Sequence, residues 1–88
     1  MSWVFELTED AKKDLRSLPS NIQRRVARVI DQMLAGPFQG DVKALKGIEW
    51  EGTFRRRMGS YRVLFTVDQK KQILHVVRIL IRSKGSYR

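Results

Sequence analysis

The chain has 88 residues, of which 42% are hydrophobic, and its formal net charge at pH 7 is +9. This length suits one compact domain, so we expect residues 1–88 to form a single domain. The sequence has no cysteine and one histidine, which excludes disulfides and thiolate metal sites and argues against a histidine-based zinc site. We therefore expect no metal and no other cofactor.

The distribution of charge and of apolar residues limits location and partner. No apolar stretch approaches a membrane span, and the first ten residues lack the apolar segment of a signal peptide, so we expect a soluble, cytoplasmic protein. Residues 1–50 hold eight Lys and Arg against seven Asp and Glu, whereas residues 51–88 hold ten against two. The second half is therefore expected to bind an anion such as nucleic acid, an acidic protein or an anionic membrane surface.

The first element expected along the chain is a strand. Bulky apolar residues occupy every second position of residues 3–7, the period of a half-buried strand. Thr8 is expected to cap a first helix, because acidic residues and a helical apolar stripe follow it. Pro19 ends this helix.

A second helix follows at once. Ser20 and Gln23 have the spacing of a capping box, and Gly36-Pro37 ends the helix. Between them the apolar residues recur at helical spacing and form a broad stripe that faces a core: Ile22, Val26, Val29, Ile30, Met33 and Leu34.

Three β-type segments complete the chain. Residues 38–47 are expected to form a connecting loop or a short irregular strand, and the β-type segments cover about 48–58, 61–68 and 73–82. The order strand, helix, helix, strand, strand, strand predicts an α+β domain, in which two helices pack on one face of a mostly antiparallel four-stranded sheet.

The segment FRRRMGSYRVLF, residues 54–65, predicts a hairpin with a basic face. With Gly59-Ser60 as a two-residue turn, Met58 lies opposite Tyr61 and Arg57 opposite Arg62. One face then carries the apolar residues, with Arg56 as its one misfit. The other carries Arg55, Arg57 and Arg62, with no acidic residue nearby in sequence.

The last strand has two possible orientations. One set of alternate residues is Ile73, His75, Val77, Ile79 and Ile81, and the other is Leu74, Val76, Arg78, Leu80 and Arg82. A connection with an odd number of residues around 69–71 places the first set in the core and adds Arg78 and Arg82 to the arginine face. An even number reverses the faces, and the sequence leaves both open. His75 is interpreted as structural rather than catalytic.

Arginines that converge on an open sheet face suit phosphate, because guanidinium stays charged and its planar donors match phosphate oxygens. They could hold an RNA backbone, or they could stabilise the charge that develops on phosphorus during cleavage.

The run Arg55-x-Arg57-Met58-Gly59-Ser60-Tyr61-Arg62 resembles the central signature of the RelE/ParE toxin superfamily, and length and element order extend the resemblance to the whole chain. The resemblance implies one of two activities. RelE-type members are ribosome-dependent endoribonucleases that cut mRNA in the decoding site, whereas ParE-type members poison DNA gyrase without cutting RNA. Both pair with an acidic, partly disordered antitoxin.

The tail, residues 82–88, resembles the RelE-type ending. The resemblance implies a catalytic set of Arg62, Arg82, Tyr87 and Arg55, with Thr53 where the best-studied branch has a second lysine. Residues expected to bind RNA are Arg57, Arg78, Lys84 and Lys46.

The function expected from the resemblance is that of a type II toxin, a metal-independent endoribonuclease that cleaves mRNA by attack of the 2′-hydroxyl. Its expected partners are an acidic antitoxin, with which it forms a hetero-oligomer, and a 70S-type ribosome with mRNA. No contact with a membrane is expected. A gyrase inhibitor on the same fold and a non-catalytic basic nucleic-acid-binding module remain as alternatives.

Overall fold

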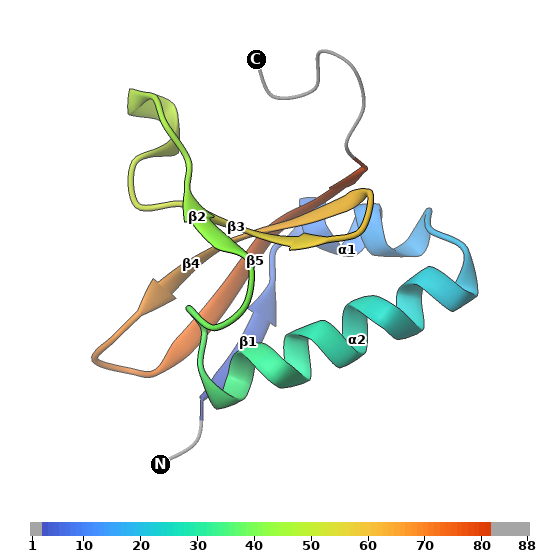
Figure 1. Cartoon of the computed structure of the whole chain (residues 1–88), viewed down its shortest axis with the longest axis horizontal. Helices are drawn as coiled ribbons and strands as arrows, with labels where there is room; N and C mark the ends of the chain where they lie inside the picture. Colours follow the sequence, from blue (N-terminus) through green and yellow to red (C-terminus); the bar gives the residue numbers. More distant parts are fainter. Residues whose placement is uncertain (1–2, 82–88) are drawn as a thin grey trace.

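The computed structural model describes residues 3–81 and has a five-stranded sheet with two helices (Figure 1). In chain order the elements are β1 (Val4–Leu7), α1 (Glu9–Arg16), α2 (Ser20–Ala35), β2 (Val42–Ala44), the 3₁₀ helix η1 (Ile48–Trp50), β3 (Phe54–Met58), β4 (Tyr61–Asp68) and β5 (Ile73–Ile81). The strand order is β1-β5-β4-β3-β2, with β1 parallel to β5 and the other pairs antiparallel. The α+β class and the element order are confirmed, and the sheet has five strands instead of four.

The extra strand is β2, within residues 38–47, the segment expected to be a loop or a short irregular strand. It pairs with β3 through Val42 opposite Arg56 and Lys43 opposite Arg55. The next β-type segment starts later than expected, because residues 48–50 form η1 and β3 begins at Phe54. Gly47 and Gly52, with φ of +104° and +79°, take the left-handed conformations that turn the chain on either side of η1.

The two helices begin differently from each other. Thr8 caps α1 as expected, since its Oγ1 accepts a hydrogen bond from the Ala11 N–H at 3.1 Å. The predicted capping box of α2 is wrong. Pro19 occupies the N-cap position, no side chain caps the helix, and Gln23 Nε2 instead donates to the carbonyl of Leu18 at 3.0 Å.

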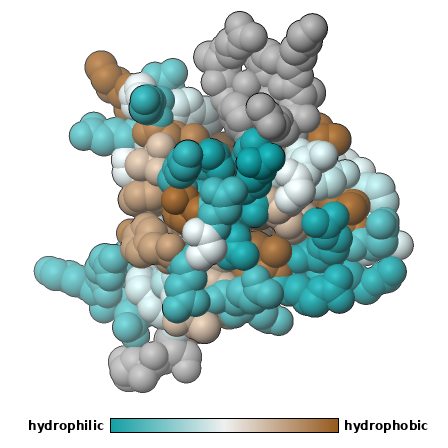
Figure 2. Space-filling model, viewed as in Figure 1, coloured by the Kyte–Doolittle hydropathy of each residue, from teal (hydrophilic) through white to brown (hydrophobic). Residues whose placement is uncertain are grey.

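The core lies between α2 and one face of the sheet. The buried side of α2 presents Ile22, Val26, Ile30 and Met33. They pack with side chains of β3, β4 and β5: Met58, Val63, Phe65, Leu74, Val76 and Ile79. The surface over the outer side of α2 is largely hydrophilic (Figure 2). We call the sheet face turned away from α2 the open face.

The β3–β4 hairpin has the predicted register. Met58 pairs with Tyr61 and Arg57 with Arg62 around the Gly59-Ser60 turn, where Gly59 has a φ of +61°. Arg56 lies on the helix side, as expected of the one charged residue on the apolar face of the hairpin. Its guanidinium reaches polar groups in the last turns of α2 and in the loop that follows. It donates to Gln32 Oε1 at 3.1 Å and to the carbonyl of Gln39 at 3.3 Å.

A β-bulge in β5 resolves the two orientations of the last strand. Asp68 pairs with Ile73, so the connection has an even number of residues and Val76 faces the core opposite Phe65. The register then shifts, because Leu64 pairs with Arg78 and Val77 is the extra residue. Ile79 therefore returns to the core, and each predicted orientation holds for only half of the strand.

No helix within residues 3–81 has the length and hydropathy needed to cross a membrane.

Candidate nucleic-acid interface

The open face carries basic side chains from three adjacent strands. Arg57 of β3 pairs with Arg62 of β4, and Lys43 of β2 pairs with Arg55 of β3. Directly opposed residues share a face, and their Cβ atoms are about 4.5–5.5 Å apart. We call Lys43, Arg55, Arg57 and Arg62 the basic cluster. Like charges at this spacing repel one another, so the cluster carries an electrostatic cost that a bound anion would relieve.

Arg55 is held in a partly buried position. Its side chain is 20% exposed, and its Nη1 lies 3.9 Å from Asp41 Oδ1. That distance is too long for a hydrogen bond, and Nη1 is a buried atom without a hydrogen-bond acceptor among residues 3–81. A buried donor without an acceptor is costly, and a movement of the Arg55 side chain that brings Nη1 to a phosphate oxygen would satisfy it.

Arg62 and Arg57 differ in depth although they are paired. Arg62 is 5% exposed, and its Nη1 donates to the carbonyl of Tyr61 at 3.4 Å. Arg57 is exposed and has no hydrogen bond or ion pair through its side chain to any other residue of the described chain. The hairpin thus offers one guanidinium at the surface beside one that is almost fully buried.

Arg78 is engaged by a carboxylate inside the protein. It pairs with Leu64 across β4 and β5, but its Nε and Nη2 donate to Asp14 of α1 at 2.8 and 3.2 Å. Burial alone would raise the pKa of Asp14, but hydrogen bonds from Arg78 and the Ile79 N–H, together with the charge of Arg78, lower that pKa below 3.8. The hydrogen bond to Asp14 likewise raises the pKa of Arg78. Arg78 therefore stands apart from the basic cluster.

Other residues expected at the site have different positions. Lys46 is exposed in the loop between β2 and η1, beyond the strand that carries Lys43. Thr53, at the family lysine position, is 9% exposed, and its N–H donates to the carbonyl of Trp50. Arg82, Lys84 and Tyr87 lie outside the described residues. The fold thus brings together Arg55, Arg57 and Arg62, and adds Lys43.

Two acidic residues near the arginines were missed by the sequence analysis, Asp14 and Asp41. Asp41 comes one residue before β2, and alternation along residues 41–43 puts it on the same side as Lys43. Its position could have been deduced from the sequence only if β2 had been recognised as a strand paired with β3.

His75 also faces away from the core. It pairs with Thr66 on β4, and its Nδ1 lies 3.5 Å from Glu6 Oε1 on β1. Leu64 lies between Thr66 and Arg62 on the same face of β4, so His75 is separated from the basic cluster. Within residues 3–81 no group of three or more His, Asp or Glu side chains is arranged to hold a metal ion.

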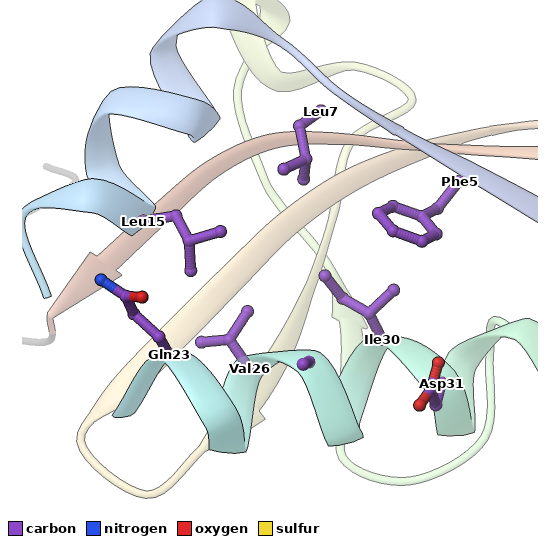
Figure 3. Close-up of a pocket in the computed structure, with 8 residues that line it drawn as sticks. Phe5, Leu7, Leu15, Gln23, Val26, Ile30 and Asp31 are labelled. Carbon is purple, nitrogen blue, oxygen red and sulfur yellow. The ribbon is translucent and has the colours of Figure 1, made fainter. Parts of the chain in front are cut away.

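The helix side of the molecule has an apolar groove of about 200 Å³ between β1, α1 and α2 (Figure 3). Phe5 and Leu7 of β1 point into it from one side, and Val26 and Ile30 of α2 from the other. Asp31 is the one charged residue among those that line it. An apolar groove of this kind does not suit phosphate, so the basic cluster is the better candidate for an anion site.

The fold is similar to that of several crystal structures of toxins. A chain of the RelBE2 toxin–antitoxin complex from Mycobacterium tuberculosis matches with a TM-score of 0.82 and 26% identity, covering 93% of this chain and 100% of that chain. A chain of the archaeal RelE–RelB complex from Pyrococcus horikoshii matches with a TM-score of 0.78 and 26% identity, covering 97% and 100%.

Isolated Escherichia coli RelE toxin matches with a TM-score of 0.77 and 19% identity, covering 96% of this chain and 88% of that chain, which shows a shared fold. No curated protein is significantly similar in sequence. The model of the family described as ParE toxin of the type II toxin–antitoxin system, parDE, matches residues 5–85. The α+β fold with its basic hairpin is shared with RelE structures, and the family match covers nearly the whole sequence. This chain therefore belongs to the ParE toxin family, within the RelE/ParE superfamily of type II toxin–antitoxin systems.

Proposed function

We propose that this toxin is a ribosome-dependent endoribonuclease that cleaves mRNA by attack of a 2′-hydroxyl on the adjacent phosphate. The observation that carries the proposal is the basic cluster, in which Arg57 and Arg62 are directly opposed and Arg55 holds an unsatisfied buried donor. A phosphate oxygen supplies the acceptor that Arg55 Nη1 lacks, and the charge of a phosphodiester increases during cleavage.

Each residue has a role in this proposal. Arg62 and Arg82 neutralise the charge that develops on the phosphate, and Arg55 positions the RNA backbone. Tyr87 acts as base or stacks on an RNA base. Arg57, Lys46 and Lys84 extend the contact to neighbouring phosphates. Arg78, also expected to bind RNA, has a smaller part in this proposal, because its Nε and Nη2 donate to Asp14.

We further propose that the partner in the cell is an acidic antitoxin. Two of the similar structures are toxin–antitoxin complexes, from Mycobacterium tuberculosis and Pyrococcus horikoshii. A net charge of +9 favours an acidic partner, because binding relieves the repulsion among the basic residues. Tenfold weaker antitoxin binding on raising the salt from about 0.1 to 0.5 M would support this electrostatic contribution.

Inhibition of DNA gyrase is the second candidate, and the match to the ParE family favours it. In that case, the basic cluster would contact the gyrase–DNA complex without cutting RNA. Expression of the toxin should then damage DNA in cells and produce no new RNA ends.

Controlled expression followed by mapping of new RNA 5′ ends against the reading frame tests the proposal. We expect codon-phased ends with the wild type and with Arg28→Ala, which removes an exposed charge on α2. Arg55→Ala should reduce these ends at least about tenfold, because one contact to the charged phosphate is lost. Arrest of growth with damaged DNA and no new RNA ends would instead identify the gyrase inhibitor.

A further inference from the structure

Asp41 is the acidic residue that the fold brings to the basic cluster. Its carbonyl accepts a hydrogen bond from the Arg57 N–H at 2.9 Å, so it stands opposite Arg57 at the start of the β2–β3 pairing. Its Oδ1 lies 3.9 Å from Arg55 Nη1, which places the carboxylate on the open face. The Asp41 side chain is 48% exposed and therefore accessible to a bound substrate.

The pairing puts Asp41, Arg57 and Arg62 in one row across neighbouring strands. Adjacent strands are about 4.8 Å apart, so the row spans roughly 10 Å between the first residue and the last. A phosphodiester and the ribose that precedes it fit in such a span. RNA whose phosphate is held by Arg55 and Arg62, and whose preceding ribose lies toward β2, would present its 2′-hydroxyl to Asp41.

We propose, on the basis of the nuclease function above, that Asp41 is the general base of the cleavage. Its carboxylate takes the proton of the 2′-hydroxyl while the 2′ oxygen forms a bond to phosphorus and the bond from phosphorus to the 5′ oxygen breaks. The 5′ oxygen leaves with the electron pair of that bond and takes a proton from solvent water. Asp41 then returns its proton to solvent, and the products are a 2′,3′-cyclic phosphate and a 5′-hydroxyl.

Other groups in the described chain are less suited to this role. Tyr61 packs against the core, on the sheet face opposite to the basic cluster. His75 lies beside Glu6, beyond Leu64 and away from the basic cluster. A carboxylate is ionised at neutral pH and accepts a proton without prior activation. With Asp41 as base, Tyr87 has the remaining role of stacking on an RNA base.

Single-turnover cleavage of mRNA on 70S ribosomes tests the role of Asp41. Asp41→Asn keeps the size of the side chain and removes its charge, and we expect the rate to fall about 100-fold or more. Binding of the variant to the ribosome–mRNA complex should be unchanged or tighter, because a negative charge is removed from the basic face. Asp31→Asn makes the same change of charge at an exposed position of α2, on the helix side of the sheet, and should leave rate and binding unaltered.

The dependence of the rate on pH separates proton transfer from a structural effect. The rate of D41N should rise more steeply with pH than that of the wild type, because hydroxide replaces the carboxylate. The charged side chains that face Asp41 are Lys43, Arg55 and Arg57. Asp41→Glu retains a carboxylate and should cleave at least about tenfold faster than D41N.

Two outcomes would overturn the proposal in different ways. Equal single-turnover rates for wild type, D41N and D41E, or a loss of rate explained by lost binding, would exclude Asp41 as the base and leave the nuclease proposal standing. If neither the wild type nor D31N cleaves mRNA on ribosomes, the nuclease proposal is wrong, and the role of Asp41 is wrong with it.

Discussion

Asp14 and Arg78 join the first helix to the last strand through a bidentate ion pair, although 64 residues separate them in sequence. The same carboxylate accepts a hydrogen bond from the Ile79 N–H at 2.9 Å. The pairing of β1 with β5 ends at Leu7 and Val76, so within residues 3–81 the part of β5 that follows Val76 has no neighbouring strand on that side. Asp14 therefore satisfies a backbone donor that the sheet leaves unpaired, next to the β-bulge at Val77.

Replacing Asp14 with Ala should lower the free energy of unfolding by about 1–3 kcal/mol, because a partly buried N–H and a guanidinium lose their acceptor. Urea unfolding monitored by circular dichroism measures the change. Asp31→Ala is the matched control at an exposed position of α2 and should change stability by less than about 0.5 kcal/mol. Equal stabilities of D14A and D31A would contradict the importance of this ion pair.

The contribution of Asp14 should depend on pH. Its pKa in the folded protein is lower than the ordinary 3.8, so protonation favours the unfolded chain. The stabilisation is fully present above about pH 5 and is lost as the pH falls through the folded-state pKa. Urea titrations of wild type and D14N at pH 7, 5, 4 and 3 should give a difference in unfolding free energy that shrinks below pH 4. A difference that stays constant to pH 3 would be inconsistent with the lowered pKa.

Arg56 and Arg57 are neighbours in sequence, but their replacement by Ala should affect different properties, stability for Arg56 and RNA binding for Arg57. Arg57→Ala should weaken binding of single-stranded RNA and reduce the slope of log affinity against log salt by about 0.7, the value for one lost phosphate contact. Arg56→Ala should leave that slope unchanged and lower stability by about 1 kcal/mol, because its bonds to Gln32 and Gln39 are lost. Fluorescence anisotropy across a salt series and urea unfolding measure the two effects. Identical slopes for both variants would remove Arg57 from the RNA contact.

Gly59→Ala should destabilise the protein by about 1–2 kcal/mol, because the residue has a φ of +61° and an L side chain is strained there. The new Cβ would also lie 3.2 Å from Arg25 Nη2, a contact that the flexible Arg25 side chain can relieve. Thermal unfolding of G59A and of the double variant G59A/R25A tests this account. The stability lost by G59A relative to wild type should equal the stability lost by G59A/R25A relative to R25A. If the double variant is as stable as R25A, the contact with Arg25, and not the φ of Gly59, is responsible.

The sequence determined how the arginines of the hairpin are paired. A two-residue turn at Gly59-Ser60 leaves one register for Arg57 and Arg62, and alternation along each strand puts Arg55 on the same face. Tertiary contacts decided the charge balance around these arginines. Asp14 and Asp41 reach Arg78 and Arg55 through helix packing and pairing with β2, and neither contact can be read from local spacing.

For the fold, local patterns in the sequence were sufficient to predict the α+β class, the order of the main elements, the Thr8 cap and the apolar stripe of α2, because each depends on residues within a few positions of one another. The tertiary structure decided between a loop and the short strand β2, and it alone decided the bulge at Val77. A three-residue strand has too few residues to show a period, and a bulge forms where strand pairing and core packing require one extra residue. Such non-local requirements placed Ile79 in the core and directed Arg78 to Asp14.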